Sequence, residues 1–597
     1  MSPPLLNLRS FLSRLREKGE VVDIYEEVDP YLEIAEIHRR VAAIAGPALF
    51  FHRVKNSAFP VVTNLFGSKK RIDVAFENRP EEILGEVVKL LTTEFPPKLK
   101  DLWKKRDLIK SLLKLGTKRR RKVPVSEVIS SNPNLESLPL LQLWPQDGGH
   151  FITLPLVYTE HPDGRGVNLG MYRIQRYDKK TAGLHFQIAK GGGFHYHLAE
   201  KRNQSLPVSI FIGGAPALIL SAITPLPENV SELLVAALLQ GEKVGMGKYQ
   251  EYSLLAECEF ALLGSAPPKI RHAEGPFGDH YGYYSLIHDY PLFNCHKLLH
   301  RKNAIYPATV VGKPKQEDFY IGEYLQKLLS PLFPLVIPGV KSIWSYGEAG
   351  FHSISAAIVK ERYYRECMTS AFRILGEGQL SLTKFLFLTD QNVPLQNFKH
   401  TLATILERFD PVTDLFIFSN LSLDTLDYTG PALNQGSRGV FLGIGEKKRE
   451  LPQEFKGTLP SPLSKAALFC RGCLVIEGPK YESFTNFDLI TGHVDFALFP
   501  LIILVDHLKK TLRDETSFLW TVFTRFEPAA DIHAQKQEII RHHICYKGPL
   551  LIDARMKPSY PSEVLCDEKT SELVTKKWNL YFPQGMEIGS SDTAHVH

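Results

Sequence analysis

Two acidic side chains stand in a short segment that is rich in turn-forming residues. Glu274 and Asp279 are separated by a stretch in which Gly275, Pro276 and Gly278 disfavour a helix. Two carboxylates held close together cannot both ionise freely, so the pKa of one is expected to rise toward neutrality, as acid/base catalysis requires. The alternative is a solvated acidic turn, because most acids in loops are simply exposed.

Aromatic residues surround the two acids and favour the catalytic interpretation. Phe277, Tyr281, Tyr283 and Tyr284 lie in the same segment. They can line an apolar pocket, in which a carboxylic acid stays protonated near neutral pH. We therefore interpret residues 274–284 as an active-site loop.

Three other segments carry groups that suit a phosphate or a cation. Asn168 and Arg173 offer an amide oxygen and a guanidinium just after a glycine-rich turn. Lys190 is followed by three glycines whose backbone amides could surround a phosphate, although a plain glycine linker is the commoner meaning. Glu232 is expected in the first turn of a helix, where an acid can also serve only the helix dipole.

The elements that must position these groups differ along the chain. Residues 1–122 predict an α/β domain, with a helix from about Leu5 to Gly19, a second helix after Asp29 and short strands beside them. The basic run 118–122 is interpreted as a solvated linker, with lipid phosphates or nucleic acid as its alternative partners. Residues 123–315 carry short apolar runs between glycines and prolines, which predicts a barrel or sandwich. Helix and strand alternation returns over residues 316–450.

An internal repeat extends into the C-terminal region. Residues 385–390 and 408–414 recur as residues 501–506 and 525–531, with a shared Arg-Phe-acid-Pro-x-x-Asp turn. This predicts a duplicated α/β subdomain, with residues 451–597 as a degenerate copy that covers the first copy or forms a subunit interface. Lys384 before the first repeated strand corresponds to Pro500, so only the first copy can offer that ammonium group to a ligand.

Composition limits the classes of partner. The 597 residues carry 71 basic and 65 acidic side chains, so the net charge of +6 makes no strong case for nucleic acid. No apolar run approaches the ~20 residues that span a bilayer, and the N-terminus lacks a signal-peptide core. We therefore expect a cytoplasmic protein, with peripheral membrane contact left open.

Seven cysteines argue against a disulfide framework. Cys470 and Cys473 form a C-x-x-C pair, which can be redox-active or half of a zinc site. His542, His543 and Cys545 could be imagined as the other half, but the spacing matches no standard zinc module. Free thiols are the preferred interpretation.

Residues 168–173, 224–232 and 274–284 together resemble the UbiD family of nonoxidative aromatic and unsaturated-acid decarboxylases, and the likeness runs from Leu8 to about residue 445. It implies an N-terminal α/β domain, a central split β-barrel like that of flavin reductases and a C-terminal α/β domain that contributes to dimerisation. It also implies prenylated FMN, made by a flavin prenyltransferase, with Mn²⁺ (or Mg²⁺) and often K⁺. A homodimer or higher homo-oligomer is expected.

Residue by residue, the resemblance implies Arg173, Glu274 and Asp279 as the catalytic network, with Asp279 as the proton donor. It implies Asn168 and Glu232 as metal ligands. Many members have a histidine where this chain has Ala189, so a third ligand stays open between His185 and water. The cofactor contacts that it implies are Asn168, Met171, Tyr172, Arg173, His185, Phe186, Gln187, Lys190, Gly191 and Lys384.

The extension beyond residue 450 resembles the longer members proposed for menaquinone biosynthesis by the futalosine route. This favours a dihydroxynaphthoate-type substrate, with polyprenyl-4-hydroxybenzoate of ubiquinone biosynthesis as the alternative. Two other classes stay open: a split-barrel oxidoreductase with ordinary FMN, and a noncatalytic quinone-pathway assembly protein. An intact acid network argues against the assembly protein.

Overall fold

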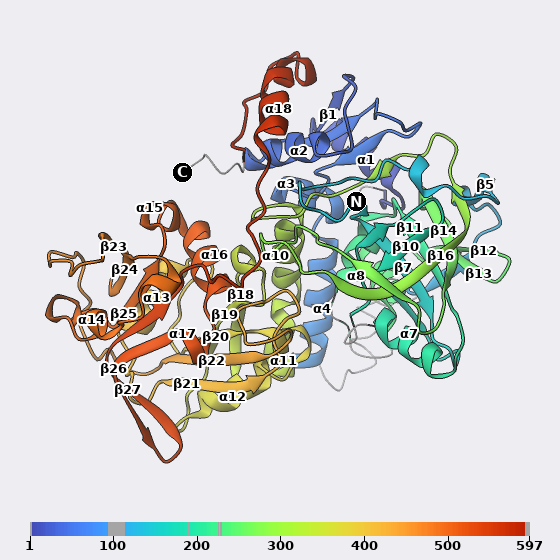
Figure 1. Cartoon of the computed structure of the whole chain (residues 1–597). Helices are drawn as coiled ribbons and strands as arrows, with labels where there is room; N and C mark the ends of the chain where they lie inside the picture. Colours follow the sequence, from blue (N-terminus) through green and yellow to red (C-terminus); the bar gives the residue numbers. More distant parts are fainter. Residues whose placement is uncertain (1–2, 94–113, 188–190, 225, 227–229, 592–597) are drawn as a thin grey trace. The chain divides into compact units, whose positions relative to one another are not determined.

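The structure, a computed structural model, describes residues 3–93, 114–187, 191–224, 226 and 230–591 (Figure 1). Contacts within the chain divide it into two compact units. The first comprises Met1–Leu328 together with Glu563–His597, and the second comprises Leu329–Ser562. The first unit thus contains the domains predicted over residues 1–122 and 123–315, and the boundary between those two stays a prediction.

The C-terminal extension does not fold as the single domain predicted over residues 451–597. Residues from Glu563 onward return to the first unit, where α18 (Glu568–Tyr581) packs against α2 (Glu33–Ala43) (Figure 1). Val574, Trp578 and Tyr581 recur at helical spacing and are buried in the core of that unit. Removing these apolar side chains from water is the physical reason for the return, and the repeat alone gave no sign of it.

A small mixed sheet forms the N-terminal part of the first unit. Its strand order is β1 (Val21–Ile24), β2 (Ala48–Phe51), β3 (Val61–Thr63) and β17 (Tyr306–Pro307), so the last strand comes from beyond the central region. The predicted first helix is confirmed as α1 (Leu8–Glu17), which begins after the capping side chain of Asn7. The second predicted helix is confirmed as α2. The remaining helices here are α3 (Lys69–Phe76) and α4 (Arg79–Thr93).

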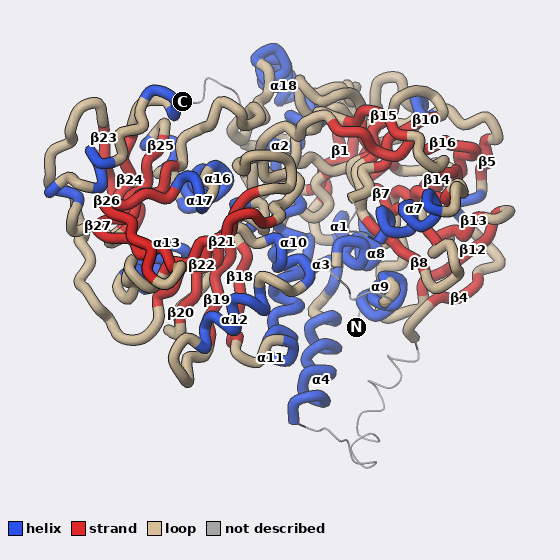
Figure 2. The backbone as a smooth tube through the Cα atoms, turned by 60° about the horizontal axis from the view of Figure 1, so that its bottom comes forward, coloured by secondary structure: helices blue, strands red, loops and turns tan. Residues whose placement is uncertain are grey.

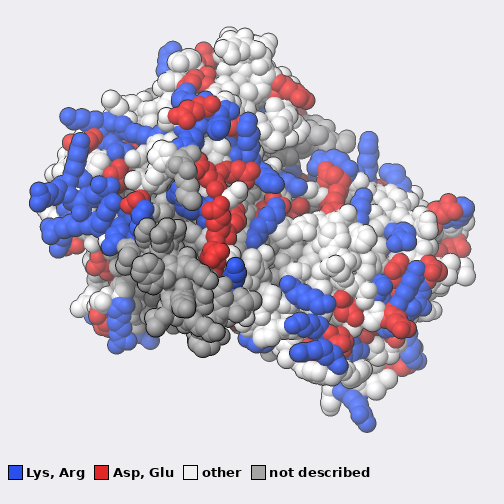
Figure 3. All heavy atoms as spheres, turned by 180° about the vertical axis from the view of Figure 1, so that it is seen from behind, with Lys and Arg blue, Asp and Glu red and all other residues white. Residues whose placement is uncertain are grey.

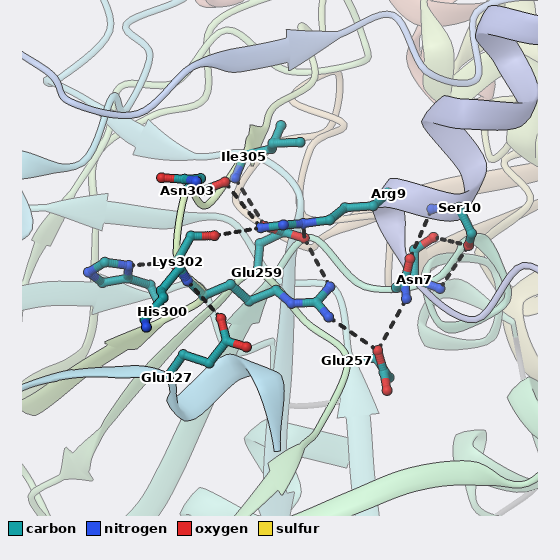
Figure 4. Close-up of polar contacts among 11 residues, drawn as sticks. Asn7, Arg9, Ser10, Glu127, Glu257, Glu259, His300, Lys302, Asn303 and Ile305 are labelled. Carbon is teal, nitrogen blue, oxygen red and sulfur yellow. Dashed lines mark hydrogen bonds and ion pairs between the residues drawn. The ribbon is translucent and has the colours of Figure 1, made fainter. Parts of the chain in front are cut away.

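A buried carboxylate ties α1 to the large sheet of the same unit (Figure 4). Glu259 has no exposed surface, and its two oxygens each lie 2.9 Å from a guanidinium nitrogen of Arg9. Arg301 and the backbone N–H of Ile305 donate to the same carboxylate at 3.3 and 3.1 Å. We call Arg9, Glu259 and Arg301 the Glu259 cluster.

Ten strands form the large sheet. β5 (Val128–Ser130) and β15 (Arg271–Glu274) pair with its longest strand, β16 (His288–His300). The pairings between described residues run from β6 to β8 without closing, so the expected split barrel is not confirmed. The main path is β6 (Phe151–Ile152), β9 (Ile174–Arg176), β10 (Thr181–Leu184), β16, β14 (Phe260–Ala266), β11 (Leu206–Ile212), β7 (Pro155–Glu160) and β8 (Val167–Gly170).

The helices that follow are α7 (Gly191–Lys201), α8 (Pro216–Ile223), α9 (Glu232–Gln240) and α10 (Glu317–Leu329), of which α7, α8 and α9 contact strands of this sheet. None of the helices in the described part of the chain is both long and apolar enough to cross a bilayer.

The basic run is not the solvated linker that the sequence suggested. Residues Thr117–Arg119 form β4, which pairs in parallel with β12 (Val244–Tyr249), and β13 (Tyr252–Leu255) completes this three-stranded sheet. Arg119, Arg121 and Lys122 are nevertheless exposed. On the face drawn in Figure 3, Lys and Arg side chains gather at the left edge and mix with acids elsewhere.

The second unit contains two five-stranded sheets with the same topology (Figure 2). In each, two parallel pairs lie between two antiparallel pairs. The first sheet is ordered β18 (Val340–Ser345), β19 (Ile354–Val359), β20 (Phe385–Thr389), β22 (Gly436–Gly443) and β21 (Leu415–Leu421). The second is ordered β23 (Lys465–Cys470), β24 (Cys473–Glu477), β25 (Leu501–Val505), β27 (His543–Asp553) and β26 (Ile532–Ile540).

The helices of the second unit follow the same repeat. Those of the first half are α11 (Phe333–Val336), α12 (Glu366–Ile374) and α13 (Phe398–Leu406). Those of the second half are α14 (Asp488–Thr491), α15 (Leu508–Thr511), α16 (Glu515–Arg525) and α17 (Pro528–Asp531).

The repeated turn has the same hydrogen bonds in both copies. Asp414 accepts from the backbone N–H of Asp410 at 2.9 Å, and Asp531 accepts from that of Glu527 at 2.6 Å. A lysine that follows the last strand of each copy in the sequence forms an ion pair with the aspartate of the turn. Lys448, after β22, pairs with Asp414, and Lys557, after β27, pairs with Asp531. This agreement supports the predicted duplication.

The two copies share one hydrophobic core. Phe387 and Phe398 of the first copy lie in the same buried cluster as Phe469, Phe518 and Phe523 of the second. Phe469 and Phe518 stack with ring centres 3.5 Å apart. The second copy therefore covers apolar surface of the first, which is one of the two roles predicted for it.

Candidate active site

Arg173 brings the two loop acids together. It lies between β8 and β9, and its Nε and Nη2 donate to the two oxygens of Glu274, the last residue of β15, at 2.7 and 2.9 Å. Its Nη1 pairs with Asp279, and Nη2 also donates to Ser285 at 3.1 Å. A bidentate arginine fixes the orientation of a carboxylate as well as its charge. We call Arg173, Glu274 and Asp279 the Arg173 cluster.

The expected rise in a carboxylate pKa is wrong, because Arg173 lies between the two acids. Burial alone would raise the pKa of Glu274, which has no exposed surface, but the charge and hydrogen bonds of Arg173 and a bond with His185 lower it to about 2. Burial also acts to raise the pKa of Asp279, yet His280 and Arg173 hold it well below its ordinary value. Both acids are therefore carboxylates at neutral pH.

Asp279 is held by its own neighbour and by the loop backbone. Its Oδ1 lies 2.6 Å from Nδ1 of His280 and accepts the His280 backbone N–H at 2.7 Å. Its backbone N–H donates to the carbonyl of Tyr283 at 3.1 Å. The loop thus places the carboxylate of Asp279 directly against the imidazole of His280.

The aromatic residues predicted to line a pocket around the acids lie in the core, and the pocket itself stays a prediction. Phe277, Tyr281, Tyr283 and Tyr284 are all buried. The guanidinium of Arg173 lies over the ring of Phe277, 4.6 Å from its centre. These rings exclude water from the acid network and strengthen its electrostatic interactions.

Groups that the sequence interpretation missed clamp the loop from β9 and from residues 147–148. Asp147 accepts the backbone N–H of Gly278 at 2.8 Å and also the N–H groups of Leu143 and Trp144. Burial raises the pKa of Asp147 to about 7. Gln175 accepts from the N–H of Gly275 at 2.8 Å and donates to Gly148 at 2.7 Å. The sequence feature that could have revealed this contact is the Asp-Gly-Gly run at residues 147–149, which is typical of a turn that carries an acid.

The C-terminal return segment supports the same loop. The N–H of Val564 donates to the carbonyl of Gly282 at 3.0 Å, and Glu563 pairs with Tyr283 in an antiparallel bridge. Glu563 also forms an ion pair with Lys313. A segment far beyond the family-like region of the sequence therefore braces the residues next to Asp279, and nothing in the sequence pattern pointed to this contact.

Some of the cofactor contacts expected in the first unit lie next to one another, and we call Asn168, Tyr172, Phe186 and Gly191 the cradle. Their contact with a cofactor stays a prediction. Tyr172 packs edge-on against Phe186 at 5.2 Å between ring centres, and its hydroxyl accepts the backbone N–H of Gly192 at 3.2 Å. A side chain at Gly191 would place its Cβ 2.1 Å from the amide oxygen of Asn168. A side chain at position 191 would therefore require Asn168 to move.

The neighbouring side chains extend this cradle toward the acids. His185 lies 3.3 Å from Glu274 through Nδ1, and Met171 packs against the apolar core. Gln187 follows Phe186 and is partly buried. Lys190, and Ala189 beside it, lie outside the described residues.

Asn168 and Glu232 bring oxygen donors to the strand β8. Asn168 is buried and its Nδ2 has no hydrogen-bond partner, while the carboxylate of Glu232 accepts the N–H of Leu169 at 3.0 Å. Burial raises the pKa of Glu232, as expected of a carboxylate without a cation beside it. The carboxylate of Glu232 and the amide oxygen of Asn168 are ligand types that suit a hard cation such as Mn²⁺ or Mg²⁺. The partnerless Nδ2 of Asn168 is instead a hydrogen-bond donor, which suits an acceptor such as a phosphate oxygen. The described residues contain no cluster of three His, Cys, Asp or Glu side chains for a metal.

Lys384 lies in the second unit, at the start of β20. It is 1% exposed, and its Nζ lies 2.7 Å from Asp427. Burial lowers the pKa of Lys384 and the charge of Asp427 opposes that shift. Its cofactor contact stays a prediction.

Profiles of three domains of 3-octaprenyl-4-hydroxybenzoate carboxy-lyase match the chain. The N-terminal domain matches residues 12–91, the Rift-related domain residues 117–314 and the C-terminal domain residues 319–443. A Chlamydia pneumoniae protein that is named as part of a 4-hydroxybenzoate decarboxylase is 54% identical over 578 residues, 96% of this chain and 98% of that protein. An Archaeoglobus fulgidus protein without an assigned function is 35% identical over 447 residues, 74% of this chain and 92% of that protein.

Solved structures agree with the profiles. Vanillic acid decarboxylase from Sedimentibacter hydroxybenzoicus, in its closed form, matches with a TM-score of 0.65 at 26% identity, over 77% of this chain and 97% of that one. The UbiD-class enzyme HmfF from Pelotomaculum thermopropionicum, solved with FMN, has the same fold, with a TM-score of 0.62 at 20% identity over 76% and 97% of the two chains. This chain belongs to the UbiD family, whose members are decarboxylases, and it is a carboxy-lyase of that family.

Proposed function

We propose that this chain removes the carboxylate of an aromatic acid in respiratory quinone biosynthesis, with prenylated FMN and a divalent metal as cofactors. The observation that carries the proposal is the Arg173 cluster, in which one arginine holds two buried acids beside a cradle with an unsatisfied Asn168 amide. A fold likeness to HmfF, which has been solved with FMN and with prenylated FMN, supports a flavin.

The chemistry divides between the bound group and the chain. When bound, the modified flavin would supply the electron sink for loss of CO₂. Arg173 orients Asp279 and gives a positive charge to the substrate carboxylate in a water-poor pocket. Asp279 then delivers the proton that replaces the carboxylate.

Asp279 must first gain that proton, since its low pKa leaves it ionised when the pocket holds no substrate. A substrate carboxylate beside Arg173 adds a like charge and raises the pKa of Asp279. His280, whose Nδ1 lies 2.6 Å from Asp279, is placed to pass the proton on. Glu274 keeps Arg173 in position from the other side.

The cofactor would be held by the cradle. Asn168 and Glu232 would bind Mn²⁺ or Mg²⁺ next to the flavin phosphate, with K⁺ as a further ion and water completing the metal shell. The remaining contacts in this proposal are Met171, Tyr172, Arg173, His185, Phe186, Gln187, Lys190, Gly191 and Lys384.

Two aromatic ring systems are candidates for the substrate, and a different observation supports each. The length beyond the family profiles, which this chain shares with its Chlamydia pneumoniae relative, favours a dihydroxynaphthoate-type menaquinone precursor. The name of that relative favours a 4-hydroxybenzoate, such as the polyprenyl form of ubiquinone biosynthesis. We further propose a cytoplasmic homo-oligomer that receives its cofactor from a flavin prenyltransferase.

The test is the cofactor itself. Protein made together with a flavin prenyltransferase is expected to carry prenylated FMN by mass and absorption, and about one Mn²⁺-like ion per chain. It should release CO₂ from one of the two acids and leave NAD(P)H unoxidised. Plain FMN with NAD(P)H turnover would instead identify an oxidoreductase, and the absence of any flavin would favour the assembly protein.

A further inference from the structure

Two thiols face each other at the end of a hairpin in the second unit. β23 ends at Cys470 and β24 begins at Cys473, and the two residues are partners across the ladder, with Arg471 and Gly472 as the turn. Opposite residues in an antiparallel ladder have Cα atoms about 4.5–5.5 Å apart. A disulfide needs about 4.4–6.8 Å, so this backbone already meets the requirement.

The two thiols interact but differ in exposure. Burial raises the pKa of Cys473 well above its ordinary value, and its contact with Cys470 raises it further. All seven cysteines lie in described parts of the chain, and Cys470 alone is partly exposed while the other six are buried. An accessible thiol backed by a buried one is the arrangement in which the first meets an outside disulfide and the second resolves the adduct.

The turn that carries the thiols is fixed on several sides. Gly472 has φ +79°, where other residues are strained, and its N–H donates to Pro452 at 3.1 Å. Arg471 lies 3.6 Å from Glu407 of the first copy. A metal is the weaker alternative, because the described residues hold no third ligand grouped with this pair.

We propose that Cys470 and Cys473 form a reversible dithiol/disulfide couple whose reaction partner is a small disulfide of the glutathione type. The Cys470 thiolate attacks one sulfur of that disulfide and displaces one thiolate. Cys473 then attacks Sγ of Cys470 and displaces the second. The two protein thiols lose two electrons and two protons, and the external disulfide gains them as two thiols. This couple is independent of the decarboxylase chemistry.

The test uses the full-length protein equilibrated with graded ratios of oxidised to reduced glutathione. After acid quenching and alkylation of denatured protein, the peptide that contains residues 470–473 should change, in one two-electron transition, from a doubly alkylated form to an unalkylated form two hydrogens lighter than the free dithiol. Dithiothreitol should restore both thiols. Cys473→Ser should trap a glutathione adduct on Cys470, Cys470→Ser should form neither product, and the control Cys367→Ser should form the disulfide normally.

Three results would overturn the proposal. The first is a wild-type protein that keeps both thiols reduced at the highest ratio. The second is a wild-type protein that accumulates a stable glutathione adduct on Cys470 without closing the ring. The third is a tightly bound Zn²⁺ that protects both thiols, which would make the pair a metal site.

Discussion

Two clusters of arginine and carboxylate in the described part of the first unit, the Glu259 cluster and the Arg173 cluster, differ in their surroundings, and only the Arg173 cluster has neighbouring groups that could serve a ligand. In the Glu259 cluster, each carboxylate oxygen accepts two hydrogen bonds: Oε1 from Arg9 and Arg301, and Oε2 from Arg9 and the N–H of Ile305. These bonds saturate a side chain that has no exposed surface. The cluster joins α1 to the large sheet and leaves nothing for a ligand.

The Arg173 cluster also contains a bidentate arginine–glutamate pair, but its hydrogen-bonding groups are not all used within the cluster. Asp279 is shared with the imidazole of His280, buried aromatic rings line the loop, and the neighbouring strand carries the unsatisfied amide of Asn168. A buried ion pair by itself is therefore weak evidence of function. Unfilled hydrogen-bonding capacity next to titratable groups is what distinguishes the Arg173 cluster, the one proposed as catalytic.

Removal of Arg173 should have the largest effect. Arg173→Met leaves Glu274 and Asp279 as uncompensated buried acids, which should lower the free energy of unfolding by about 3–5 kcal/mol. Loss of the charge that faces the substrate carboxylate should lower kcat/KM by about 10³-fold. Urea unfolding and CO₂ release measure the two effects. Normal turnover in a folded Arg173→Met protein would remove the cluster from the mechanism.

The Glu259 cluster should separate stability from activity. Glu259→Gln removes the charge that accepts hydrogen bonds from Arg9 and Arg301, and because the Arg9 side chain is partly exposed to water we expect a loss of only about 1–3 kcal/mol in the free energy of unfolding. Because this cluster touches no part of the cradle, kcat and flavin content should stay at the wild-type level in the folded protein. A kcat loss as large as that of Arg173→Met would contradict the comparison.

The return segment can be tested at one hydrogen bond. Val564→Pro removes the N–H that binds Gly282, so the loop should loosen, with a loss of about 1–2 kcal/mol in stability and about tenfold in kcat. Val564→Ala keeps that N–H and loses only side-chain packing, so it should lower stability without the same loss of kcat. Equal kcat values in the two variants would show that the bond does not position the loop.

The last prediction of this comparison concerns pH and leaves stability at neutral pH unchanged. The pKa of Glu274 is about 2 in the folded state and about 4.3 in an unfolded chain. Its stabilising contribution is therefore complete above pH ~4.3 and is lost as pH falls toward 2, by at most about 1.4 kcal/mol per pH unit. The difference in unfolding free energy between wild type and Glu274→Gln should shrink over that window. A difference that is constant with pH would show that the pKa of Glu274 is not lowered.

Local sequence patterns predicted much of this arrangement, and long-range contacts account for the misses. The spacing of glycines and aromatics pointed to residues 274–284, where Arg173 holds two buried acids. The repeated turn at residues 408–414 and 525–531 anticipated two sheets of one topology. The direction of the carboxylate pKa shift was wrong, because the position of Arg173 between the acids depends on the pairing of distant strands.

The role of the extension was predicted only in part for the same reason. Its repeat was visible, whereas the bond from Val564 to Gly282 joins residues that no periodicity relates. Truncation near residue 450 would consequently remove α18 from the core of the first unit as well as the second repeat. Such a deletion could not separate an interface role from support of the active site, and Val564→Pro is the sharper variant.

Asp279→Asn tests the central claim most directly. The protein should be made together with a flavin prenyltransferase and compared with wild type and Glu259→Gln for flavin spectrum, metal content and CO₂ release. The account predicts that Asp279→Asn keeps the cofactor but loses turnover by about 10²-fold or more, the usual scale for a general acid. Unimpaired decarboxylation by the loaded Asp279→Asn protein would contradict it.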